Sequence, residues 1–263
     1  MSRLFEVNDL HVTYRRPGEK PLEAVKGVSF ALEEGETLGI VGESGSGKST
    51  IAKALMLLLP ASGGEILFCG RNVGKFSAAE RRGYRRDVQM VFQDAVGSLN
   101  PRMTIRQTLA EAFAVSGRAD AADGPRKPED LLDIVGLSRA VLDQYPRELS
   151  GGQCQRASFA RALAVHPRVL VADEPVSALD VSVQARILNL MRDLRRGLGL
   201  AVILIAHDLA VVRNVCDRVC VMHKGLFADA GTADEVFARP TSDYTKNLLA
   251  AVPDVARELA KRI

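Results

Sequence analysis

Gly42-Glu43-Ser44-Gly45-Ser46-Gly47-Lys48-Ser49 lies between the apolar run TLGIV (37–41) and the helical pattern TIAKALMLLL (50–59). The stretch fits the pattern G-x-x-x-x-G-K-[ST], in which glycines let backbone N–H groups curve around phosphate oxygens. The N-terminus of the following helix adds partial positive charge. The order strand, loop, helix therefore predicts an α/β fold with a phosphate-binding loop.

The residues of this loop have distinct expected roles. Lys48 is expected to reach the β- and γ-phosphates of a nucleotide, and the Ser49 hydroxyl is expected to hold Mg²⁺. The predicted nucleotide contacts are Gly42, Glu43, Ser44, Gly45, Ser46, Gly47, Lys48, Ser49 and Thr50.

A pair of carboxylates ends a second apolar run, VLVADE (169–174). Ligands gather at the carboxyl ends of parallel strands, so these side chains are expected near the phosphate loop. We expect Asp173 to contact Mg²⁺ and Glu174 to polarise an attacking water. Together the two motifs predict an ATPase.

A second stretch suited to phosphate is LSGGQCQR (149–156). A serine and two glycines open a predicted helix there, again placing N–H groups and a helix dipole where an anion could bind. The chain thus carries two phosphate-binding stretches about a hundred residues apart.

The remaining sequence alternates strands and helices, which favours a mainly parallel sheet. Residues Phe5 to Tyr14 predict an edge strand, and further strands are expected at 27–32, 37–42, 65–68, 88–92, 169–173, 200–206 and 217–222. Helices are expected at 48–59, 78–87, 182–196, 233–238 and 244–252. Between residues 94 and 149 the pattern predicts a helical segment. Helices are expected there at 104–113, 128–137 and 138–145, with a polar linker at 117–128.

Composition limits the classes of function. The 263 residues include 35 basic and 32 acidic ones, a balance too even to indicate nucleic-acid binding. The N-terminal stretch MSRLFEVNDL lacks the layout of a signal peptide, and the apolar runs 54–59 and 200–206 fall short of the about 18 residues of a spanning helix. We therefore expect any membrane association to come through partners.

The order of motifs resembles that of ATP-binding-cassette proteins over nearly the whole chain. LSGGQ before ASFARAL is similar to the family signature, VFQD (91–94) to its Q-loop, SALD (177–180) to its D-loop and LIAHD (204–208) to its switch region. The resemblance implies that Tyr14 stacks on adenine and that His207 contacts the γ-phosphate. It also implies that Gln93 binds Mg²⁺ and links the nucleotide to the helical subdomain. It gives Asp180 a role in communication across a dimer.

The fold implied by the resemblance is a P-loop NTPase core with a mainly parallel sheet, an antiparallel β subdomain and an inserted helical subdomain. The core would comprise residues 1–93 and 162–263, and the helical subdomain residues 94–161. In this family two such domains pack head to tail, so the signature of one caps the ATP bound to the other. The residues expected to contact the partner's nucleotide are Ser150, Gly151, Gly152 and Gln153.

Four stretches resemble the ATPases of bacterial oligopeptide and dipeptide importers: SLNPRMT (98–104), SGGQCQR (150–156), DEPVSALDVSVQA (173–185) and TSDYTKNLLAAVP (241–253). PVSALD (175–180) is nearer to the second of the two ATPase types that these importers use. That resemblance implies a second, different ATPase subunit, two transmembrane permease subunits and an extracytoplasmic binding protein, with no nucleic acid. It places the chain peripherally on the cytoplasmic face of the inner membrane.

Two departures keep alternatives open. The family's DPYASLNPRM is DAVGSLNPRM (94–103) here, and the predicted helix VARELAKRI (255–263) carries no cysteines for an iron–sulfur cluster. Shorter nickel-importing relatives also lack such a tail, so nickel or another small solute is the alternative cargo. A soluble complex resembling the cassette ATPase of carbon–phosphorus lyase is a second alternative. DNA-repair cassettes insert a long coiled coil, whereas the segment before this signature predicts short helices.

Overall fold

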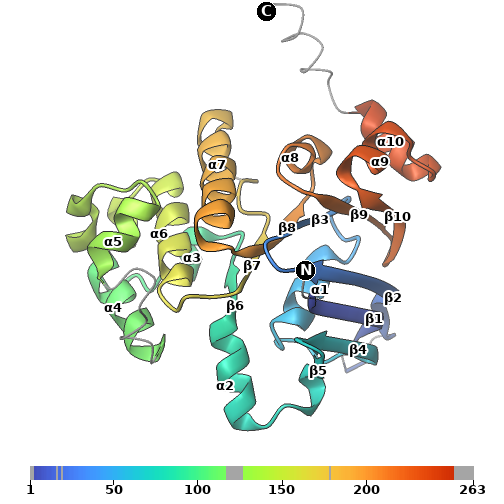
Figure 1. The fold of residues 1–263 in the computed structure, drawn as a ribbon, viewed down its shortest axis with the longest axis horizontal. Helices are drawn as coiled ribbons and strands as arrows, with labels where there is room; N and C mark the ends of the chain where they lie inside the picture. The colour runs from blue at the N-terminus through green and yellow to red at the C-terminus, as the bar shows by residue number, and fades with distance from the viewer. Residues whose placement is uncertain (1–2, 16, 19, 117–126, 178, 252–263) are drawn as a thin grey trace, which may run out of the picture.

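The computed structural model describes residues 3–15, 17–18, 20–116, 127–177 and 179–251. Its centre is a six-stranded sheet in the order β10-β9-β3-β8-β7-β6 (Figure 1). All neighbouring strands are parallel except β10, which pairs antiparallel with β9. The strands are β3 (Thr37–Val41), β6 (Val88–Val91), β7 (Val169–Asp173), β8 (Ala201–Ala206), β9 (Arg218–His223) and β10 (Leu226–Thr232).

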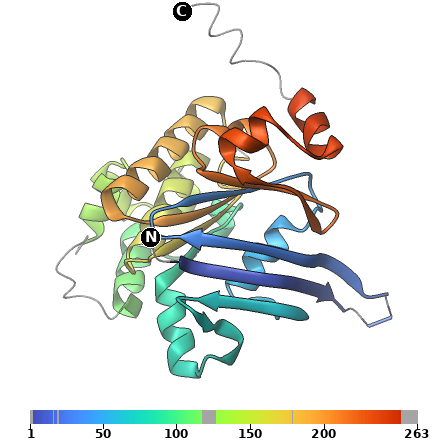
Figure 2. The same ribbon diagram turned by 45° about the vertical axis from the view of Figure 1, so that its right-hand side comes forward.

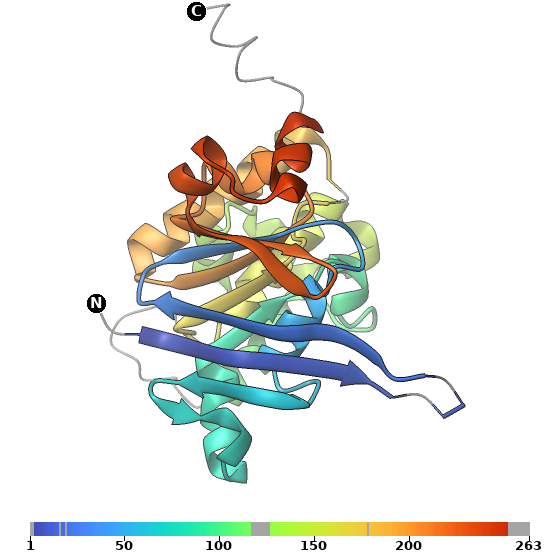
Figure 3. The same ribbon diagram turned by 90° about the vertical axis from the view of Figure 1, so that its right-hand side faces the viewer.

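A second, antiparallel sheet has the order β2-β1-β4-β5. Its strands are β1 (Arg3–Tyr14), β2 (Leu22–Glu33), β4 (Gly63–Phe68) and β5 (Arg71–Asn72). β1 and β2 run side by side along most of their length (Figure 3). The prediction of an edge strand at 5–14 is wrong, because β1 has a partner on both sides. The alternation of apolar and polar residues indicates which face of a strand is buried. It does not indicate how many strands pair with it, because pairing is made by backbone groups along the two edges of the strand.

Helix α1 (Lys48–Leu55) lies between the two sheets, where it contacts β1, β2, β7 and β8 (Figure 2). It ends earlier than the expected residue 59. Leu57 takes a left-handed conformation with φ of 56°, and the N–H groups of Leu57 and Leu58 bond back to the carbonyls of Ala54 and Lys53. These two bonds form a Schellman motif, which ends the helix several residues before Pro60.

The helices that follow β6 gather at one side of the molecule (Figure 1). They are α3 (Ala95–Ser98), α4 (Ile105–Ser116), α5 (Pro128–Ile134) and α6 (Gly151–Leu163). The helix expected at 138–145 is a 3-10 segment, Arg139–Asp143. Most of the linker expected at 117–128 lies outside the described residues, as does the helix expected at 255–263. Helix α2 (Ala78–Asp87) precedes β6 and has its predicted bounds.

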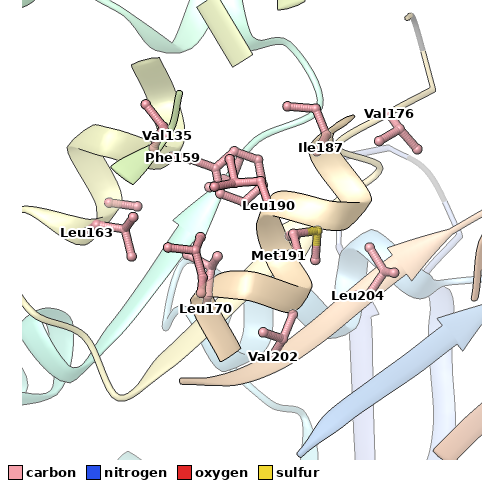
Figure 4. Packing of buried hydrophobic residues seen from close by; sticks show 14 of the residues in the cluster. Val135, Phe159, Leu163, Leu170, Val176, Ile187, Leu190, Met191, Val202 and Leu204 are labelled. Atoms are coloured by element: carbon pink, nitrogen blue, oxygen red, sulfur yellow. The ribbon is translucent and has the colours of Figure 1, made fainter. Parts of the chain in front are cut away.

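The six-stranded sheet separates two hydrophobic cores. Successive side chains of β7 point to opposite faces, so Val169 and Val171 join the core around α1, and Leu170 and Ala172 join the core under the helices. On the helical side, Phe159 of α6 is fully buried among residues of α7 (Val181–Leu198) and the sheet (Figure 4). This packing ties α6, whose first residues belong to the signature, to the six-stranded sheet.

In the described part of the chain, three short helices follow β8: α8 (Leu209–Arg213), α9 (Ala233–Ala238) and α10 (Asp243–Ala251). Helices α9 and α10 lie beside β10 (Figure 1). Within the described part of the chain, no helix is both long enough and apolar enough to cross a bilayer.

Candidate active site

Four neighbouring parallel strands end at the same edge of the sheet, and a predicted functional residue follows each of them. The phosphate loop follows β3, His207 follows β8, Glu174 follows β7 and, one residue further on, Gln93 follows β6. The carboxyl ends of parallel strands form the usual ligand-binding edge of such a sheet. The fold therefore brings together residues that are up to 165 positions apart, from Gly42 to His207.

A cavity of about 380 Å³ opens beside these strand ends. That volume lies in the range of small-ligand pockets. The antiparallel sheet contributes one wall and the phosphate loop the other. Its lining residues are Tyr14, Leu22, Ala24, Ser44, Gly45, Gly47, Lys48, Ser49, Thr50, Gln93 and Glu174.

Two loop glycines are required by their surroundings. Gly42 has φ of 156° and Gly47 has φ of 113°. A Cβ atom at Gly42 would lie 2.1 Å from the Met222 carbonyl oxygen, and one at Gly47 would lie 2.4 Å from the Ala24 carbonyl oxygen. Any other residue would force the backbone apart, so the tight curve of the loop depends on both glycines.

Lys48 is buried, with 4% of its surface exposed. Its ammonium donates hydrogen bonds to the carbonyl oxygens of Gly42 and Glu43, at 2.7 and 2.8 Å. Burial lowers the pKa of Lys48, and the nearby carboxylates of Glu174 and Asp173 oppose that shift. A buried cation held by its own loop is a strong site for an anion that can replace those carbonyls.

Ser49 and Asp173 form an oxygen-rich pair at the start of α1. The Ser49 hydroxyl donates to Asp173 Oδ1 at 3.0 Å. Burial raises the pKa of Asp173, opposed by the hydrogen bond from Ser49. In the described residues no group of three or more His, Cys, Asp or Glu side chains could hold a metal. A hydroxyl and one carboxylate fit Mg²⁺, which takes few protein ligands and completes its shell with phosphate and water.

Glu174 is held in an unusual position by its neighbours. Its φ is 45°, a left-handed conformation that is costly for a residue with a side chain. Its carboxylate accepts a hydrogen bond from Gln93 Nε2 at 2.9 Å, and His207 Nδ1 lies 3.9 Å from the same oxygen. The carboxylate thus faces the cavity with a polar group on two sides.

Tyr14 lies at the end of β1 and reaches the phosphate-loop helix. Its hydroxyl is 3.2 Å from the Thr50 hydroxyl. The Tyr14 side chain thereby forms part of the cavity lining. Leu22, its β2 partner in the sheet register, is 65% exposed and adds apolar surface at the same place.

The signature residues do not line this cavity. Ser150 is the N-cap of α6: its hydroxyl accepts from Gln153 N–H at 3.3 Å, and Gln153 Oε1 accepts from Ser150 N–H at 2.8 Å. Ser150 and Gly151 are exposed. Gly151 lines a separate cavity of about 310 Å³ that also touches Gln93 and Glu174.

One further predicted residue, Asp180, lies at the start of α7, and another, Gly152 of α6, packs against it. Asp180 is its exposed N-cap and makes no side-chain capping bond. A Cβ atom at Gly152 would lie 2.7 Å from Val183 Cγ1 of the same helix. The neighbouring Ala178 of the predicted D-loop lies outside the described residues.

Sequence reasoning missed several site residues. Leu22 and Ala24 line the cavity, Ser177 accepts a hydrogen bond from Gln93 at 3.4 Å, and Tyr244 of α10 bonds to the phosphate loop. Tyr244 stands within the stretch TSDYTKNLLAAVP, whose resemblance to a family motif was a signal without an assigned role. Ser177 likewise stands within SALD (177–180), whereas Leu22 and Ala24 carry no local pattern.

The family model described as ABC transporter matches residues 25–177. The oligopeptide transport ATP-binding protein OppF of Lactococcus lactis subsp. lactis (strain IL1403) is 45% identical over 271 residues, which cover 100% of this chain and 85% of that protein. OppF of Haemophilus influenzae is 47% identical, over 95% of this chain and 78% of the relative. The dipeptide transport ATP-binding protein DppF of Lactococcus lactis subsp. cremoris (strain MG1363) is 44% identical, over 95% and 81%.

Solved structures give the same result. A dimeric post-hydrolysis state of the ATP-binding cassette MJ0796, bound to ADP and phosphate, is 28% identical with a TM-score of 0.76, covering 88% of this chain and 99% of that one. The cbiO1 component of an ABC transporter complex from Clostridium perfringens is 26% identical with a TM-score of 0.75, over 99% and 100%. The chain belongs to the ATP-binding-cassette family and is an ABC transporter ATPase that binds adenine nucleotide.

Proposed function

We propose that this chain is the ATP-hydrolysing subunit of an importer of dipeptides and oligopeptides. The observation that carries the enzymatic part is the convergence of Lys48, the Ser49–Asp173 pair and Glu174 at the strand ends beside one cavity. The peptide cargo is supported by the relatives named above, which are oligopeptide and dipeptide transport ATP-binding proteins at 44–47% identity.

Binding is assigned to the loop and to the antiparallel sheet. Adenine stacks on the Tyr14 ring, and the triphosphate enters the curve of residues 42–50. Lys48 then exchanges the carbonyl oxygens of Gly42 and Glu43 for the β- and γ-phosphates. The exchange is favourable because a charged phosphate is a stronger acceptor than a carbonyl for a buried ammonium.

Ser49, Asp173 and the Gln93 side-chain oxygen are the proposed ligands of Mg²⁺. When bound, the ion offsets negative charge on the β- and γ-phosphate oxygens. Of the three, Ser49 and Asp173 already lie within hydrogen-bond distance of each other. Gln93 instead donates its amide to Glu174, which leaves its carbonyl oxygen free to face a metal.

Hydrolysis is assigned to Glu174 as general base toward an attacking water. His207, whose Nδ1 lies 3.9 Å from Glu174 Oε2, positions that water and contacts the γ-phosphate. Gln93 donates a hydrogen bond to Glu174 and begins the segment that leads from β6 to helices α3, α4, α5 and α6. It can therefore transmit a change at the site to these helices.

The signature is assigned to the nucleotide of a second ATPase subunit. Ser150 and Gly151 are exposed at the N-terminus of α6, outside this chain's own nucleotide cavity, and Asp180 is exposed nearby on α7. A head-to-tail heterodimer would bring Ser150, Gly151, Gly152 and Gln153 to the partner's γ-phosphate and give Asp180 a neighbour across the interface. Two permease subunits would hold the pair at the cytoplasmic face of the inner membrane, with an extracytoplasmic binding protein outside. The division at residues 94 and 161 into core and helical subdomain remains a prediction of the same scheme.

The complete transporter in lipid nanodiscs tests this proposal. ATP hydrolysis is measured with the binding protein loaded with a short peptide, with nickel, or with neither. We expect stimulation by peptide and none by nickel. Stimulation by nickel alone, or isolation of the chain with soluble enzymes in place of permeases, would replace peptide import with one of the alternatives.

A further inference from the structure

Helix α10 contacts the phosphate loop directly. The hydroxyl of Tyr244, in its first turn, accepts a hydrogen bond from the backbone N–H of Glu43, with 3.2 Å between N and O. The carbonyl of the same peptide bond belongs to Gly42 and accepts from Lys48 Nζ at 2.7 Å. A trans peptide is planar, with its N–H and C=O pointing in opposite directions. Tyr244 and Lys48 therefore hold one peptide plane from opposite edges.

The position of Tyr244 is itself well fixed. Its ring packs on the His223 ring with 3.9 Å between centroids and 35° between planes. The backbone of the preceding turn is anchored by Asp229, which accepts from the N–H groups of Thr241 and Ser242 at 3.0 and 3.1 Å. The hydroxyl thus reaches the loop from a platform built by β9, β10 and α10.

The same platform supports the loop at a second point. The N–H of Gly225, in the turn between β9 and β10, donates to the Ser46 carbonyl oxygen at 2.9 Å. The Met222 carbonyl lies so close to Gly42 that a Cβ atom there would be 2.1 Å away. Segments near the end of the described chain therefore support the phosphate loop, and Met222, Gly225 and Tyr244 are not among the residues that line the cavity.

We propose that Tyr244 is a positioning residue for nucleotide binding, because it holds the Gly42–Glu43 peptide in place when Lys48 leaves its carbonyl for phosphate. The inference rests on the proposed role of this loop as the triphosphate site. A loop that is already held loses less conformational freedom when it binds, so the hydroxyl contributes to affinity without touching the nucleotide. By linkage, nucleotide binding must strengthen the docking of α10 to the same extent.

The test is Tyr244→Phe in the full chain, which keeps the ring on His223 and removes only the hydroxyl. Titration with a fluorescent ADP analogue is expected to show about 2- to 10-fold weaker binding, the scale of one net hydrogen bond. In the assembled transporter, KM for ATP rises by a similar factor and kcat at saturating ATP is unchanged. Amide hydrogen exchange of residues 243–251 slows on adding ADP in the wild type and slows less in the variant.

The matched control is Tyr145→Phe, which removes a half-buried hydroxyl that has no hydrogen bond to another described residue and leaves affinity unchanged. Unchanged affinity and unchanged exchange in Tyr244→Phe would overturn the inference. So would a loss of affinity matched by a lower Tm in the absence of nucleotide, because that result means general unfolding. Lys48→Ala separates a failure of this inference from a failure of the proposed role of the loop. If the Lys48→Ala protein binds ADP and ATP as the wild type does, the loop is not the triphosphate site.

Discussion

The side-chain amide of Gln93 donates a hydrogen bond to the Glu174 carboxylate, with 2.9 Å between Nε2 and Oε2. The two residues follow adjacent strands, β6 and β7, whose backbones pair from Val88–Val169 to Val91–Ala172. The contact joins the proposed catalytic base to the first residue of the segment that leads into the helices. A substitution of Glu174 should therefore affect the position of Gln93, and a substitution of Gln93 should affect the position of Glu174.

Glu174→Gln keeps the shape of this contact and removes the basic carboxylate. The amide oxygen can still accept from Gln93, so ATP binding is retained, but the side chain cannot take a proton from water. We expect steady-state ATP hydrolysis by the assembled transporter to fall at least ~100-fold, the scale of a lost general base. Glu34→Gln is the control, since Glu34 bonds Arg168 and does not line the cavity. Turnover of the Glu174 variant near the wild-type rate would remove Glu174 from the role of base.

Asp173→Asn tests the proposed metal ligands. The amide retains an acceptor for the Ser49 hydroxyl but loses the negative charge that attracts a divalent cation. Titration of ATP with magnesium and then with EDTA should give different affinities for the wild type and nearly equal affinities for the variant. If the Asp173→Asn protein keeps the full magnesium dependence, Asp173 is excluded as a ligand.

Ser150→Arg tests the signature. Ser150 is exposed and lies outside the chain's own cavity, so the isolated variant should bind ATP normally. A long cationic side chain at this position blocks close approach of a partner's nucleotide, and ATP hydrolysis by the assembled transporter should be lost. Loss of the N-cap alone costs about 1 kcal/mol.

Ser77→Arg controls for that capping loss. Ser77 caps α2 in the same way, accepting from the N–H of Glu80 at 3.3 Å, while Glu80 bonds back to it. Its variant should lose similar stability and keep hydrolysis. Normal hydrolysis by the Ser150 variant, measured in the same assembly, would exclude a signature that meets the partner's nucleotide.

His11 gives a pH dependence outside the active site. Its ring Nδ1 is 2.9 Å from Glu23, and that hydrogen bond raises the pKa of His11 above the ordinary 6.5, with Asp9 adding to the shift. A raised pKa means that the folded state holds the proton more tightly. The stabilisation is full below pH 6.5 and is lost as pH rises through the folded pKa.

We therefore expect His11→Gln to lower Tm by about 1–2 °C at pH 5.5 and by less at pH 8.5, the scale of an exposed ion pair. Thermal unfolding of both proteins across this range checks the sign. A difference in Tm that grows with pH would contradict the assignment of the raised pKa to these carboxylates.

Local signals explain which elements could be predicted. Helix α2 has the predicted bounds, because Ser77 and Glu80 form a capping box that fixes its start. The loop between β3 and α1 could likewise be predicted, since its glycines and lysine are set by phosphate chemistry. By contrast, α1 ends at Leu55, and the left-handed residue that closes it, Leu57, is not a glycine that the sequence could have signalled.

Long-range pairing explains what could not be predicted. β10 is only partly buried and lacks a clear alternation, so its antiparallel pairing with β9 could not be predicted from the sequence. Asp173 and Glu174 were predicted because the carboxyl ends of parallel strands meet at one edge, whereas the prediction of Gln93 and His207 came from the family resemblance. The bond from Tyr244 to Glu43 joins residues 201 positions apart and depends on how α10 docks, which no local pattern encodes.

Two physical reasons for a glycine at position 152 of the signature can be distinguished by experiment. A Cβ atom at this position would lie 2.7 Å from Val183 Cγ1, so Gly152→Ala pushes α6 against α7 within the same chain. Overpacking of this kind typically costs about 1–3 kcal/mol, and Val183→Ala should relieve it. We expect the double variant to recover the Tm lost by Gly152→Ala. If glycine also makes room for the partner's phosphate, ATP hydrolysis by the assembled transporter stays low although stability has returned. Full recovery of both would show that packing against Val183 is the whole reason for the glycine.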